Sequence, residues 1–127
     1  MEESKKPTIL VVDDEPAILL SVKFLIERAG FETQTATNGT EAMEVAREVL
    51  PQIAVLDVMM PGMDGFKLAE QLRAIDQLAD LRIVFLTAKG TPQDVSEGYR
   101  SGGEVYLTKP FDNDDLVNTI KELAAFG

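Results

Sequence analysis

Hydrophobic and polar residues follow two alternating patterns along this chain. Short, nearly continuous apolar runs are typical of strands that are buried on both faces of a parallel sheet. Longer segments between them place apolar residues three and four positions apart, which predicts amphipathic helices. Gly, Pro and Asn residues separate the two kinds of segment. The pattern therefore predicts an α/β domain in which a strand and a helix alternate five times.

The boundaries of these elements follow from where each pattern starts and stops. The expected strands are residues 8–13, 31–36, 53–57, 83–87 and 104–108. The expected helices are residues 16–29, 40–49, 64–75, 92–100 and 112 onward. The second strand alternates between apolar and polar positions, so we expect it at an edge of the sheet. The prediction is a parallel sheet covered by helices on both faces.

The first expected helix carries more apolar residues than one buried face needs. Its buried stripe is predicted to comprise Ile18, Val22, Leu25 and Ala29. Leu20 and Phe24 fall nearly opposite this stripe and lie one turn apart. We interpret this pair as a contact surface for a helical partner protein, and the alternative is that both are scattered surface residues.

Composition narrows the chemistry that the chain can carry. It has 127 residues, 45% of them hydrophobic, and it contains neither cysteine nor histidine. It therefore has no disulfide, no thiolate or imidazole metal ligand, and no histidine general base. Its formal net charge of −10 disfavours nucleic acids and anionic membranes as partners, because little on the chain would neutralise phosphate groups.

The sequence shows no targeting or membrane segment. Residues 1–7 are polar and lack the apolar core of a signal peptide, and no apolar run approaches membrane-spanning length. We therefore expect an N-terminal tail at residues 1–7, one domain at residues 8–127, and a cytoplasmic location.

Polar side chains occur where the expected strands end. Asp13 and Asp14 end the first strand, Asp57 ends the third and Thr87 the fourth, and Lys109 follows the fifth. Parallel α/β sheets bind ligands at the carboxyl ends of their strands, so we expect these side chains to converge. Oxygen donors without nitrogen or sulfur favour Mg²⁺ or Mn²⁺. A carboxylate beside such a cation, with a lysine and a hydroxyl nearby, indicates phosphoryl transfer to aspartate.

These residues resemble the receiver domain of two-component response regulators. The resemblance rests on Asp13-Asp14, Leu56-Asp57-Val58-Met59-Met60-Pro61, Leu86-Thr87-Ala88 and Tyr106-Leu107-Thr108-Lys109-Pro110. It covers the chain from about residue 8 to its end. It implies a flavodoxin-like, doubly wound three-layer sandwich whose five-stranded parallel sheet has the order 2-1-3-4-5.

The resemblance also implies a chemical role for each site residue. Asp57 would accept a phosphoryl group from a histidine on a partner protein. Mg²⁺ would be bound by Asp13, Asp14, Asp57 and the backbone carbonyl of Met59. Lys109 would bind a phosphate oxygen.

Phosphorylation would then change the shape of one face of the domain. The resemblance implies that Thr87 and Tyr106 move inward together. The affected face would be formed by the helix expected at residues 92–100, the strand at 104–108 and the final helix.

Two positions are expected to set how long the phosphoryl group lasts. Met59 lies two residues after Asp57, and Lys89 lies two residues after Thr87. Neither side chain offers a carboxylate or carboxamide that could orient an attacking water. We therefore predict slow self-dephosphorylation.

The implied partners are a sensor histidine kinase or a histidine phosphotransfer protein, and a downstream protein target. We expect a monomeric, stand-alone receiver that catalyses only its own phosphorylation and slow dephosphorylation. Three alternatives are a magnesium-dependent phosphatase with an aspartyl nucleophile, a phosphorylation-independent interaction module, and a flavin carrier. The phosphatase alternative lacks its Asp-x-Asp motif after the first strand, and the flavin alternative lacks a Ser/Thr/Gly phosphate loop there.

Overall fold

Five parallel strands form the centre of the molecule. The computed structural model describes residues 7–60, 63–87, 105–108 and 112–126. The sheet comprises β1 (Thr8–Val12), β2 (Glu32–Ala36), β3 (Ile53–Asp57), β6 (Arg82–Thr87) and β7 (Val105–Thr108). Their order is β2-β1-β3-β6-β7, and every neighbouring pair is parallel. Counting only these strands along the chain, the order is 2-1-3-4-5. The predicted fold and the edge position of β2 are therefore confirmed.

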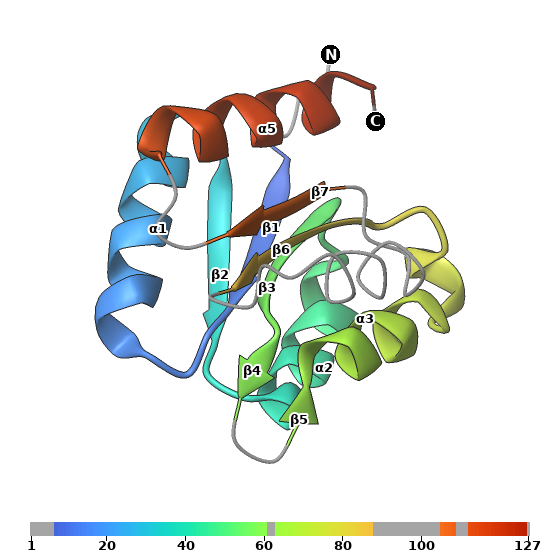
Figure 1. The fold of residues 1–127 in the computed structure, drawn as a ribbon. Helices are drawn as coiled ribbons and strands as arrows, with labels where there is room; N and C mark the ends of the chain where they lie inside the picture. The colour runs from blue at the N-terminus through green and yellow to red at the C-terminus, as the bar shows by residue number, and fades with distance from the viewer. Residues whose placement is uncertain (1–6, 61–62, 88–104, 109–111, 127) are drawn as a thin grey trace.

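Helices cover both faces of this sheet (Figure 1). They are α1 (Pro16–Arg28), α2 (Gly39–Val49), α3 (Gly65–Arg73), α5 (Asn113–Phe126) and the short 3₁₀ helix η1 (Asp76–Leu78). α1 and α5 lie on one face, and α2 and α3 lie on the other (Figure 1). The helix predicted at residues 92–100 lies outside the described residues. Among the residues that are described, no helix is both long enough and apolar enough to cross a membrane.

The strands alternate their side chains between two cores, because successive residues of a strand point to opposite faces of the sheet. Leu56 and Phe85 pack with α2 and α3 in one core. Val11, Val55 and Leu86 pack with α1 and α5 in the other. Both faces are buried, which is why the sequence shows apolar runs rather than a polar–apolar alternation in the central strands.

α1 is rotated slightly from its predicted orientation. Its fully buried residues are Leu19, Val22 and Ile26, whereas Ile18 and Leu25 are only partly buried at the edge of the same core. The buried stripe, on the side of α1 that contacts β1, β2 and α5, is therefore centred about one position away from the prediction. The predicted exposed pair is confirmed, since Leu20 and Phe24 are 70% and 59% exposed.

α2 begins and ends through local interactions. Asn38 caps its N-terminus, because its side chain accepts a hydrogen bond of 2.8 Å from the backbone N–H of Glu41. The carboxylate of Glu41 in turn accepts one of 2.7 Å from the backbone N–H of Thr37. At the C-terminal end, Leu50 adopts a left-handed conformation with φ of 48° directly before Pro51. A proline disfavours helical backbone in the residue before it, so the helix ends there at some cost in strain.

A small hairpin after β3 was not predicted. β4 (Met59–Met60) and β5 (Met63–Asp64) form an antiparallel pair in which Met59 lies opposite Asp64. Strands of two residues are too short to show any hydrophobic period, so the sequence indicated only a turn at residues 61–62. That turn lies outside the described residues. The hairpin connects the end of β3 to the start of α3, and it therefore adjoins the acidic residues.

Candidate functional site

Three carboxylates converge at the carboxyl end of the sheet. β1 and β3 are adjacent and parallel, with Val12 opposite Leu56, so the residues that follow them emerge side by side. One carboxylate oxygen from each of Asp13, Asp14 and Asp57 lies within 4.8 Å of the others. Asp13 is 2% exposed and Asp57 is 7% exposed. Of the side chains predicted to converge at the strand ends, the three acids therefore lie together.

The turn between β1 and α1 holds Asp13 in place. The backbone N–H of Asp13 donates to the carbonyl of Ala36 at 3.2 Å, which extends the pairing of β1 with β2 by one residue. The side chain of Asp13 accepts a hydrogen bond of 2.9 Å from the backbone N–H of Glu15. Pro16 then opens α1 at its first position, where the missing N–H has no cost. The acids therefore lie beside the N-terminus of a helix, whose positive partial charge attracts anions.

Gly65 packs directly against the backbone of Asp57. Its N–H donates to the carbonyl of Val58 at 2.8 Å. A Cβ atom at this position would lie 2.8 Å from the Cα of Val58 and closer still to the carbonyl oxygen of Asp57. Asp64 caps α3 by accepting a hydrogen bond of 2.8 Å from the backbone N–H of Phe66. The start of α3 is thus held against the end of β3.

The arrangement of the acids suits a divalent cation. Two unit charges no more than 4.8 Å apart repel each other by roughly 3 kcal/mol or more at an effective dielectric constant near 20. A bound cation would offset this repulsion. The donors are oxygen atoms only, which fits a hard cation better than zinc or copper.

The other predicted site residues are placed only in part. Thr87 ends β6 one residue beyond Leu86, which is the register partner of Asp57. The backbone of Thr87 therefore lies beside the acid site, and its side chain is outside the part of the chain that is described. Met59 contributes backbone to the hairpin. Lys89 and Lys109 lie outside the described residues.

Tyr106 lies in β7 and is half-buried against the core under α2 and α3. Its ring centroid is 6.0 Å from that of Phe85 and 6.4 Å from that of Phe66. The family resemblance implied Tyr106 as a switch residue, but the hydrophobic pattern did not identify the two phenylalanines as its neighbours. The register of β6 and β7, which pairs Phe85 with Tyr106, would have been needed to see this.

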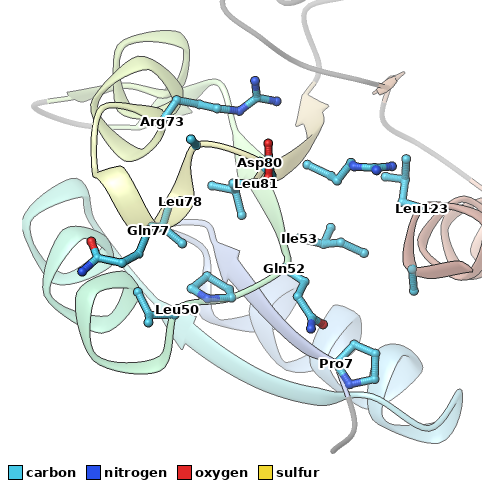
Figure 2. Close-up of a pocket in the computed structure, with 14 residues that line it drawn as sticks. Pro7, Leu50, Gln52, Ile53, Arg73, Gln77, Leu78, Asp80, Leu81 and Leu123 are labelled. Carbon is cyan, nitrogen blue, oxygen red and sulfur yellow. The ribbon is translucent and has the colours of Figure 1, made fainter. Parts of the chain in front are cut away.

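A cleft of about 480 Å³ lies at the opposite end of the sheet (Figure 2). It is lined by residues at or before the starts of the strands, among them Pro7, Gln52 and Leu81, and by Leu123 of α5. The acids lie at the carboxyl ends of the same strands. The cleft is therefore separate from the acid site.

Comparisons with known proteins find one matching family and several relatives. The model of the response regulator receiver domain family matches residues 9–121. The DNA-binding dual master transcriptional regulator RpaA of Synechocystis is 38% identical over 117 residues, which are 92% of this chain and 48% of the relative. The transcriptional regulatory protein SrrA of Staphylococcus aureus is 42% identical over 115 residues, which are 91% of this chain and 46% of the relative. The chain thus spans about half the length of these curated relatives.

A solved structure shares the whole architecture. The chemotaxis protein CheY4 of Vibrio cholerae superposes with a TM-score of 0.88 at 31% sequence identity. The match covers 93% of this chain and 98% of the CheY4 chain. The arrangement of the sheet and its flanking helices is therefore shared with this solved structure.

Proposed function

This chain belongs to the response regulator receiver family, the phosphoaccepting domains of two-component signalling, and we propose that Asp57 is its phosphoacceptor. The observation that carries the proposal is the convergence of Asp13, Asp14 and Asp57 at the carboxyl end of the sheet. Of the three acids, Asp57 alone ends a central strand with a helix start packed against its backbone. A receiver is a signalling phosphoacceptor rather than a classical enzyme, which sets aside the phosphatase and flavin-carrier alternatives.

The family implies a histidine kinase as the partner, and the transfer can be written atom by atom. A carboxylate oxygen of Asp57 forms a bond to phosphorus while the bond from phosphorus to the imidazole nitrogen of the partner breaks. The imidazole takes up the electron pair of the broken bond and a proton. We propose that Asp13, Asp14, Asp57 and the backbone carbonyl of Met59 hold Mg²⁺, or Mn²⁺ in its place. When bound, the cation would supply positive charge to the phosphoryl oxygens.

We assign the remaining roles from the family resemblance. Lys109 neutralises a phosphoryl oxygen, and Thr87 donates a hydrogen bond to another. The register supports the second assignment, because the backbone of Thr87 lies one residue beyond the neighbour of Asp57. Thr87→Ala is expected to accept phosphate but to bind its downstream target poorly. Normal target binding by the phosphorylated variant would contradict the role.

Intact mass spectrometry tests the acceptor. The protein is incubated with Mg²⁺ and acetyl phosphate, and wild type is expected to gain a single phosphoryl group. Asp57→Asn should gain none. Asp64→Asn is the matched control, because it removes an exposed carboxylate in the same segment and asparagine still caps a helix. The assignment would be overturned if Asp57→Asn gained the phosphoryl group, or if Asp64→Asn were the only protein that failed to gain it.

We propose that α1 presents the contact surface for a helical, histidine-bearing partner. Its N-terminus adjoins the acids, and Leu20 and Phe24 are exposed on it. The guanidinium of Arg28 lies 5.5 Å from the centre of the Phe24 ring, so the surface combines apolar and cationic groups.

A charged substitution tests this surface. Phe24→Asp should slow phosphotransfer from the kinase and leave phosphorylation by acetyl phosphate unchanged. Leu50→Glu is the control, since Leu50 is also exposed, at 43%, but lines the cleft at the other end of the sheet. Equal transfer rates for wild type and Phe24→Asp would contradict the proposal.

We propose that output runs through protein contact, from a monomeric, stand-alone receiver in the cytoplasm. The net charge of −10 supports protein partners over nucleic acid or anionic membrane. Immunoblotting of the source cells with an antibody to this domain tests whether the receiver occurs alone or as part of a longer protein. A band near the 13.9 kDa of this chain supports a stand-alone receiver, and a band of about twice that size would contradict it.

A further inference from the structure

Three aromatic rings from three elements meet beneath α3. Phe66 lies near the N-terminus of α3, Phe85 lies in β6 and Tyr106 lies in β7. The rings of Phe66 and Phe85 are 5.0 Å apart and cross at 76° in an edge-to-face arrangement. Tyr106 approaches both rings at 6.0 and 6.4 Å. All three separations lie within the range of favourable aromatic pairs.

Phe66 is also anchored to the backbone of the acid site. Its N–H donates to the side chain of Asp64, which pairs with Met59 in the hairpin. The preceding residue, Gly65, packs against the carbonyl oxygen of Asp57. The backbone at residues 57–59 is therefore in contact with the backbone at residues 64–65, directly before Phe66.

We propose that Phe66 is a positioning residue that couples the backbone around Asp57 to the inward position of Tyr106. The inference rests on the proposed acceptor role of Asp57, and it adds a route that does not pass through Thr87. An inward Tyr106 contacts two rings. Phe85 lies in the sheet, and Phe66 follows the glycine that packs against the backbone of Asp57. A change at Asp57 that moves this backbone therefore changes the stability of the inward position. By linkage, an inward Tyr106 also favours phosphoryl binding at Asp57.

The test follows Tyr106 directly by fluorine NMR of protein labelled with 3-fluorotyrosine. The chain has two tyrosines, and Tyr106→Phe assigns the relevant signal by its disappearance. Phe66→Leu should move this signal toward its solvent-exposed value before any ligand is added. The half-saturating concentration of beryllofluoride, a phosphoryl mimic, in the presence of Mg²⁺ should rise roughly two- to ten-fold, the equilibrium equivalent of one aromatic pair.

Leu72→Val is the matched control. Leu72 is fully buried on α3 in the same core but is not part of the aromatic group. It should leave the Tyr106 signal and the beryllofluoride response unchanged. If Phe66→Leu behaves like this control, the proposal is wrong. Should the leucine variant not fold, Phe66→Met is closer to phenylalanine in volume and carries the same expectation.

A double-mutant cycle separates coupling from simple loss of stability. The effects of Phe66→Leu and Tyr106→Leu on beryllofluoride binding should be less than additive, because either one removes the same contact. Additive effects would overturn the proposal. A failure of the acceptor assignment looks different, since wild type itself would then neither bind beryllofluoride nor gain a phosphoryl group.

Discussion

At the scale of single residues, the acid site depends on a position that has no side chain. Gly65 lets the first turn of α3 lie against the backbone of Asp57 and Val58. Nothing in a hydrophobic pattern indicates this, because the requirement comes from a close approach between two backbone segments rather than from burial. The three acids, in contrast, were predictable from the hydrophobic pattern. Each lies at the end of an apolar run, where a charge needs a compensating partner.

Gly65→Ala should damage both stability and phosphorylation. The added methyl group would lie 2.8 Å from the Cα of Val58, so the backbone beside Asp57 must shift. We expect a loss of about 1–3 kcal/mol in the free energy of unfolding, measured in urea, and a slower gain of the phosphoryl adduct.

Gly30→Ala is the control for this substitution. Gly30 has φ of 102° and no atom within 4 Å of an added Cβ, at the end of α1 away from the acids. It should cost stability through backbone strain alone and leave phosphorylation unchanged. Equal phosphorylation rates in the two variants would show that the contact of Gly65 with Asp57 has no chemical consequence.

Met59→Asn should shorten the lifetime of the phosphoryl group. A carboxamide two residues after Asp57 could orient an attacking water, which the methionine side chain cannot do. We expect hydrolysis to accelerate by roughly ten-fold or more, measured as the decay of the adduct after the phosphodonor is removed. Met60→Asn places the same group one position further along the chain and serves as control. An unchanged lifetime in Met59→Asn would count against the proposed role of this position.

At the scale of elements, the strands were predicted better than the hairpin after β3 and the orientation of α1. The central strands are buried on both faces, and their apolar runs therefore marked them clearly. The hairpin of β4 and β5 was missed because its backbone hydrogen bonds, not a side-chain pattern, define it. The rotation of α1 was missed because Ile18, Leu19, Leu25 and Ile26 are all apolar, so only packing could choose among them.

Leu50→Asn should stabilise the protein. The side chain of Leu50 is 43% exposed, and its backbone adopts the left-handed conformation. The backbone strain is therefore offset by little burial of the side chain. Asparagine adopts this conformation more readily. We expect a gain of about 0.5–1 kcal/mol and a rise of roughly 2–5 °C in Tm. Leu50→Val, a β-branched change at the same position, should lower Tm, and a rise in both variants would contradict the explanation.

At the scale of the whole molecule, the charge of the chain and the geometry of the sheet act together. The chain carries a net charge of −10, and three of its acids converge at one end of the sheet. Alternation of strands and helices was enough to predict that end, because parallel strands gather their carboxyl ends on one edge. The aromatic group under α3 could not be predicted in this way, since it depends on the register of β6 and β7 and on the cap of α3.

Because three acids converge at one site, Mg²⁺ should raise the thermal stability of the domain. A ligand that binds only the folded state at ten times its Kd adds about 1.4 kcal/mol, or roughly 3–7 °C in Tm for a domain of this size. Sodium chloride at matched ionic strength controls for general screening. Asp57→Asn should respond much less than wild type. An equal response of wild type to both salts would argue against a specific cation site.

The cleft at the far end of the sheet has a practical consequence for fusion proteins. Pro7 and Leu123 both line it, so the first strand and the last helix are joined to the rest of any longer chain on the side away from the acids. A fluorescent protein attached before β1 and another attached after α5 would leave the acid end open to a kinase. Such a doubly labelled domain could report on encounters with its partners by energy transfer without obstructing the phosphorylation it is built to observe.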